Sequence, residues 1–127
     1  MIVRIASWTL RVLFLLLLIL GLVFWVGNVD AIVPVHMILG ILFVLVLWVI
    51  AGTTAAARGG NWGLAGAAFV LGIIMIAFGL RQAIILTNSL HWIIQVIHLL
   101  LGLCGIGLGE AMTARYKRFN TTSTIAA

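Results

Sequence analysis

The chain has 127 residues, of which 65% are hydrophobic and only 7% are charged. A soluble domain of this length cannot bury so much apolar surface, because about a quarter of the residues in soluble domains are charged. The formal net charge of +5 does not indicate nucleic-acid binding, because the basic residues stand at the ends of apolar segments, where they orient helices in a bilayer. Composition therefore predicts an integral membrane protein with room for about four crossings of roughly 20 residues each.

Four apolar segments follow one another along the chain. They run from about 7 to 27, 32 to 56, 62 to 86 and 90 to 114, and a tail follows over 115–127. The basic and leucine-rich first segment superficially resembles a signal peptide, but no small-x-small cleavage site follows it, so we expect it to remain as the first transmembrane helix. The connections are short and rich in glycine and small polar residues, so neighbouring helices run antiparallel. We expect one all-α membrane domain over 1–127, an up-down bundle of four transmembrane helices followed by a disordered or loosely packed tail.

Basic residues predict the orientation of this bundle. Arg4, Arg58 and the basic residues at 115–118 share one side of the membrane in an up-down topology, whereas the opposite connections hold Asp30 and no lysine or arginine. By the positive-inside rule, the N- and C-termini and the middle connection face the cytoplasm. We expect the chain in the plasma membrane of a bacterium or an archaeon.

A histidine followed four residues later by a glycine occurs twice, as His36 with Gly40 in the second span and as His98 with Gly102 in the fourth. Each glycine lies one turn further along the same helix face and leaves a gap beside the histidine. An imidazole in hydrocarbon is costly without a partner, so an intramembrane histidine is a functional-site hypothesis. Neutral imidazole is an axial ligand of haem iron. Two such units on two parallel spans predict one haem b bound between them.

Three histidines leave the ligand pair open. The repeat favours His36 with His98, whereas depth favours His36 with His91, because His98 lies about 13 Å along its helix from Ser89. Helix tilt can absorb this offset. We prefer His36 and His98 as the iron ligands, with His91 as a hydrogen-bond donor behind them or as part of a site between subunits. The haem is then bound once per subunit or shared between subunits.

One face of the fourth span carries small and polar residues at steps of three and four: Asn88, His91, Gln95, His98, Gly102, Gly105 and Gly109. Such a face turns toward the bundle interior or toward another subunit, because polar groups at depth avoid lipid. Gln95 is therefore a further candidate for cofactor binding. Gly105 and Gly109 form a small-xxx-small motif for close helix packing, and we expect a homo-oligomer that forms through this glycine face.

Two charged residues lie near the ends of spans. Arg81 stands about a turn before the outer end of the third span, where a guanidinium either binds an anion or extends to the membrane surface. Arginine binds carboxylates in a bidentate manner, so Arg81 is a candidate for the haem propionates, with an ion pair to Asp30 as the alternative. We expect Glu110, at the cytoplasmic end of the fourth span, to pair with Arg58 or Arg115.

At the level of architecture, the four spans and the histidines His36, His91 and His98 resemble the small membrane b-type cytochromes, such as the four-helix cytochrome b561-like proteins. The resemblance implies an electron carrier with bis-histidine haem b rather than an enzyme that converts a substrate. It also implies exchange of electrons with a quinone or with another redox protein. A second haem per chain is not expected, because the chain lacks the four histidines of the di-haem members.

Two other functions fit parts of the pattern. A non-catalytic structural or accessory membrane subunit would use the histidines and Gln95 for hydrogen bonds between helices. A copper-binding membrane protein would add the soft ligands Met37 and Cys104 to the histidines. Hydrolytic and transfer chemistry is not supported, because the sequence shows no nucleophile with a base and an orienting group, no buried carboxylate pair and no phosphate-binding loop.

Overall fold

The computed structural model describes the backbone of residues 1–27 and 30–125 and the side chains of 1–27 and 31–119. The described part is all helical, without strands. Its elements are α1 (Ile2–Val26), η1 (Asp30–Ile32), α2 (Val33–Ala55), α3 (Trp62–Arg81), η2 (Gln82–Ile84) and α4 (His91–Ile125). Four of these helices are long and apolar enough to cross a membrane. The predicted all-helical class is thus confirmed, together with four helices of the predicted length and apolar character.

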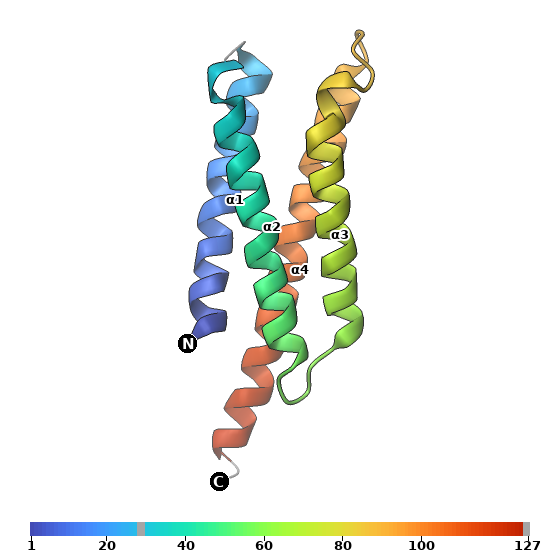
Figure 1. The fold of residues 1–127 in the computed structure, drawn as a ribbon. Coiled ribbons are helices and arrows are strands. Elements are labelled where there is room, and N and C mark those ends of the chain that lie inside the picture. Colours follow the sequence, from blue (N-terminus) through green and yellow to red (C-terminus); the bar gives the residue numbers. More distant parts are fainter. Residues whose placement is uncertain (28–29, 126–127) are drawn as a thin grey trace.

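The helices alternate in direction along a common axis (Figure 1). α1 and α3 run toward the end that carries the α1–α2 and α3–α4 connections, which we call the histidine end. α2 and α4 run back toward the end that holds both termini and the α2–α3 connection, which we call the basic end. Helix α2 packs against α1, α3 and α4. The two helices that carry the predicted ligands are therefore parallel neighbours.

Local sequence explains where several helices begin. Pro34 occupies the first turn of α2, where a missing backbone N–H costs nothing. The Asn61 side chain caps α3 by accepting a hydrogen bond of 3.0 Å from the Leu64 backbone N–H. Gly59 allows the sharp turn between α2 and α3, because its φ of +73° is a conformation that favours glycine.

The helix bounds differ from the predicted ones at both ends of the chain and in the third helix, where α3 ends at Arg81 rather than at about 86. The first helix already begins at Ile2, and α4 continues to Ile125, so the expected loose tail is helical over most of its length. Extending an existing helix adds a hydrogen bond for each residue fixed, without the cost of a new nucleus. The predicted turn at Asn28 and Val29 lies outside the described residues, and so does the side chain of Asp30.

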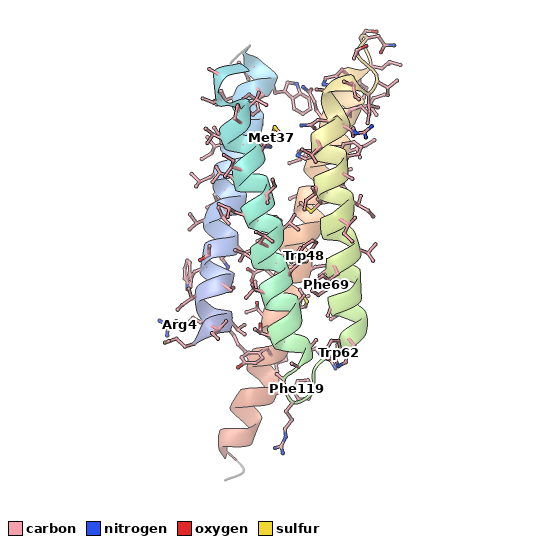
Figure 2. The ribbon with its side chains drawn as sticks, in the orientation of Figure 1. Arg4, Met37, Trp48, Trp62, Phe69 and Phe119 are labelled. Atoms are coloured by element: carbon pink, nitrogen blue, oxygen red, sulfur yellow. The ribbon has the colours of Figure 1, made fainter. Side chains whose placement is uncertain are left out.

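The packed core occupies only the half of the bundle nearest the basic end. Leu10, Phe43, Leu47 and Ile50 are almost completely buried there. Trp48 stacks on Phe69 between α2 and α3, with ring centres 5.3 Å apart (Figure 2). Among the described side chains in the other half, Ile94 alone is buried. The helices therefore interlock at the basic end and leave space at the histidine end.

The glycine face of α4 contributes to this packed half. A Cβ atom on Gly105 would lie 2.9 Å from the Phe43 ring, and one on Gly109 would collide with Leu10. These two glycines serve close packing within the chain, because α4 needs them to approach α1 and α2. The structure describes a single chain, so self-association through the glycine face of α4 stays a prediction.

Glu110 forms an ion pair that the sequence analysis assigned to other residues. The Arg11 guanidinium donates from Nε and Nη2 to the two Glu110 carboxylate oxygens, each at 2.7 Å. Arg11 also lies over the Trp8 ring, 5.1 Å from its centre. Arg58 and Arg115 were the expected partners, but α1 packs against α4 at this level and brings Arg11 to the carboxylate. This bidentate pair joins the first and last helices.

Candidate functional site

His36 on α2 and His98 on α4 face each other across the bundle. Their ring centres are 6.1 Å apart, and the ring planes are inclined by 48°. Phe24 meets the His36 ring edge-on at 5.4 Å, and Phe78 stacks on His98 at 6.0 Å. Aromatic side chains from α1 and α3 therefore support the two imidazoles from behind and fix their orientation.

One nitrogen of each imidazole has no hydrogen-bond partner. The Nδ1 atoms of His36 and His98 are buried and unpaired within the described part of the chain. Most buried polar atoms in proteins have a partner, so each exception needs an explanation. The two unpaired nitrogens indicate a site whose polar groups are completed by something other than this chain.

A cavity of about 130 Å³ surrounds the histidine pair. Each of the four helices contributes one glycine to its wall, namely Gly21, Gly40, Gly79 and Gly102. Apart from the histidines and Gln82, the wall is built from apolar side chains. Four missing side chains at one level of the bundle create the space that the packed half lacks.

The glycines have two different roles in this cavity. A Cβ atom on Gly79 would lie 3.5 Å from Cε1 of His98, and one on Gly21 would lie 4.0 Å from Cε1 of His36. These two glycines let α3 and α1 pass close to the imidazoles. A Cβ atom on Gly40 would meet nothing within 4 Å. Gly40 therefore borders open space.

The structure brings four of the predicted site residues together and separates the other three. His36, Gly40, His98 and Gly102 all line the cavity. The half-buried Gln95 does not line it, and neither does Arg81, which is exposed at the end of α3. His91 lies at the start of α4, where its Nδ1 is 3.2 Å from the Ile85 carbonyl oxygen. His91 thus contacts the α3–α4 connection rather than the cavity.

The depth difference that separated the two ligand hypotheses is absent in the folded chain. α2 begins three residues before His36, and α4 begins seven residues before His98. Because the two rings lie at one level, α4 starts about 6 Å further out along the bundle than α2 does. The repeat was therefore a better guide to the facing pair than distance from the predicted helix ends.

Gly21, Gly79 and Gln82 are among the cavity residues that the sequence analysis did not predict. The signal for the glycines was available, because α1 and α3 run opposite to α2 and α4. A glycine near the end of one helix then lies level with a histidine near the start of its neighbour. The sequence analysis predicted Arg81 as a site residue. Its neighbour Gln82, the first residue after α3, lines the cavity instead.

The donor set of this site is two neutral imidazoles in an apolar enclosure. Nitrogen ligands of this kind bind transition-metal ions, and large flat apolar walls accept an organic ring. No group of three or more His, Cys, Asp or Glu side chains that could hold a bare metal ion occurs among the described residues. In comparisons with known proteins, no family model, no curated protein and no solved structure matches this chain.

Proposed function

We propose that this chain is a small membrane cytochrome that binds one haem b between His36 and His98 and carries electrons on its iron. The observation that carries the proposal is the facing pair of imidazoles, 6.1 Å apart between ring centres, inside an apolar cavity. The haem would supply one-electron redox chemistry. The chain would supply the axial ligands, the apolar surroundings and the exclusion of water.

The spacing of the two rings supports bis-histidine ligation. A metal–imidazole bond is about 2.0 Å long, and the bonded nitrogen lies about 1.1 Å from the ring centre. Two imidazoles on opposite sides of one metal ion therefore have ring centres roughly 6 Å apart. The ring centres of His36 and His98 are 6.1 Å apart, and this separation supports the two residues as the ligands that would hold the haem iron.

The rim of the cavity favours one orientation of the bound ring. Gln82 lines the cavity at the histidine end, and Arg81 precedes it in the chain. Gln82 would offer its side-chain amide to the haem carboxylates, and Arg81, exposed next to it in the chain, stays a predicted partner for them. Gly40 and Gly102 would leave room for the ring beside the histidines.

The accessory-subunit hypothesis receives less support from these contacts. That hypothesis requires the histidines to hydrogen-bond between helices, but the buried Nδ1 atoms of His36 and His98 have no partner in the described chain. The copper hypothesis keeps one of its two soft ligands and loses the other. Met37 lines the cavity beside His36, whereas Cys104 is exposed and does not line it.

The direct test is the visible absorption spectrum of the detergent-purified protein, as isolated and after dithionite. We expect a Soret band with sharp α and β bands on reduction. His36→Ala and His98→Ala should each abolish this six-coordinate spectrum, while His91→Ala should leave it intact. A protein that is colourless and takes up no added hemin would overturn the proposal. Loss of the haem in His91→Ala alone would overturn the ligand pair.

The proposal includes a bilayer, an orientation and a redox partner. The four apolar helices are long enough to cross a bilayer, which supports a membrane location, and the basic end would face the cytoplasm by the positive-inside rule. The haem would then lie in the outer half of the membrane. Its electron partner would be a quinone in the bilayer or another redox protein, and the host would be a bacterial or archaeal plasma membrane.

A further inference from the structure

We propose that the cavity is loaded sideways from the bilayer, through an opening between α2 and α3 near the histidine end. The inference rests on the proposed function, because the molecule that passes is haem dissolved in the lipid. It concerns how the cofactor reaches the histidines, which neither the ligand pair nor the fold class decides.

Among the described side chains, the cavity wall reaches the outer surface of the chain between α2 and α3. Of the residues that line the cavity, three are exposed on that surface: Met37 (39%), Ile41 (41%) and Leu80 (55%). Met37 and Ile41 belong to α2, and Leu80 belongs to α3. Figure 2 shows Met37 on the side of α2 that is turned toward α3. The wall residues contributed by α1 and α4 are half-buried, so the opening lies between α2 and α3.

The opening is closed toward the basic end. At Gly72 the two helices come so close that a side chain there would collide with Trp48 and Val44. From this point α2 and α3 separate toward the histidine end (Figure 1). Gly79 lies seven residues beyond Gly72, which is about 10 Å further along α3. Over this length α2 and α3 move apart, so that they are separated at the level of the histidine pair.

The chemistry of the opening favours an apolar visitor from the lipid. Its three exposed residues are Met, Ile and Leu, and none carries a charge. Methionine is flexible and adapts its shape to a passing ring. A flat tetrapyrrole partitions into lipid with its carboxylates at the membrane surface, and this sideways path keeps them at the histidine end throughout.

The test compares a variant at the opening with a matched variant beside it. Leu80→Trp places an indole in the opening. Ile73→Trp places one on the same face of α3, two turns away, at a position that is equally exposed (60%) and does not line the cavity. Apoprotein in phosphatidylcholine vesicles is mixed with vesicles that carry hemin, and growth of the Soret band gives the loading rate. Excess apomyoglobin in the water then gives the release rate.

We expect Leu80→Trp to slow loading and release roughly tenfold, because the indole must leave its apolar contacts before the ring can pass. Ile73→Trp should load at the wild-type rate and reach the wild-type final spectrum. If Leu80→Trp fails to fold, Met37→Trp on the opposite wall replaces it. If Leu80→Trp loads and releases haem at wild-type rates, or if Ile73→Trp is slowed equally, the inference about the opening is overturned and the proposed function is unaffected. A wild-type chain that takes up no haem overturns the proposed function as well.

Discussion

Gly40→Leu should stabilise the empty protein and at the same time prevent it from binding haem. Gly40 borders the cavity, and a side chain built there meets nothing within 4 Å. Empty cavity volume costs about 24 cal/mol per Å³ in protein cores, so the whole cavity of about 130 Å³ corresponds to at most about 3 kcal/mol. A leucine that fills more than half of it should raise the free energy of unfolding by about 2 kcal/mol.

Gly107→Leu is the matched control. Gly107 lies on α4 and also has no neighbour within 4 Å of its Cβ position, but it does not line the cavity. Both variants gain the same intrinsic preference of leucine over glycine for helix, about 1 kcal/mol. The difference between them isolates the filling of the cavity. Thermal unfolding of the apoproteins in detergent should show a Tm roughly 6 to 10 °C higher for Gly40→Leu than for Gly107→Leu.

Hemin titration of the same two proteins supplies the second measurement. Gly107→Leu should give the wild-type Soret band, whereas Gly40→Leu should give none, although it is the more stable protein. A stable variant that has lost binding cannot be explained by misfolding. Normal haem binding by Gly40→Leu would refute the assignment of the cofactor to this cavity. A Tm of Gly40→Leu below that of Gly107→Leu would show that Gly40 does not border open space.

Three further predictions test other parts of the structure. Glu110→Gln should lower the free energy of unfolding by about 1 kcal/mol, because it removes the bidentate pair with Arg11; the effect is small since both side chains are over one-third exposed (38% and 39%). Adding Arg11→Gln should lower it little further. Fully additive losses in thermal unfolding would show that the two residues do not interact. Gly109→Leu should destabilise the chain by about 1 to 3 kcal/mol through collision with Leu10. The control Gly107→Leu, two residues away on α4, should not show this loss. Cys104→Ala should leave the absorption spectrum and the metal content unchanged, since the thiol is exposed; loss of bound metal would instead favour the copper hypothesis.

The repeat of His36 with Gly40 and His98 with Gly102 was sufficient to predict which side chains share a cavity. Both units lie near the start of parallel helices, so their equivalence in sequence becomes equivalence in space. Gly21 and Gly79 have no histidine near them in the sequence, so the repeat does not point to them. Their level in the bundle follows only when the antiparallel direction of α1 and α3 is taken into account.

Charge pairing was less predictable than the cavity. Arg58 and Arg115 were expected beside Glu110 because all three lie toward one end of the topology. The carboxylate instead pairs with Arg11, since helix rotation and the choice of neighbour decide which of several arginines at one end is within reach. Topology gives the level of a residue along the bundle, but it does not give its direction around the helix axis.

The sequence by itself determined the four apolar helices, their alternating directions and the pair of histidines, because these depend on the length and period of apolar residues and on short connections. Only the tertiary structure decided that Gly105 and Gly109 pack within the chain and that the cavity occupies the histidine end. It also decided that the opening lies between α2 and α3. These features depend on how large and small side chains of different helices interlock, and that complementarity between distant segments is not written in the pattern of any one segment.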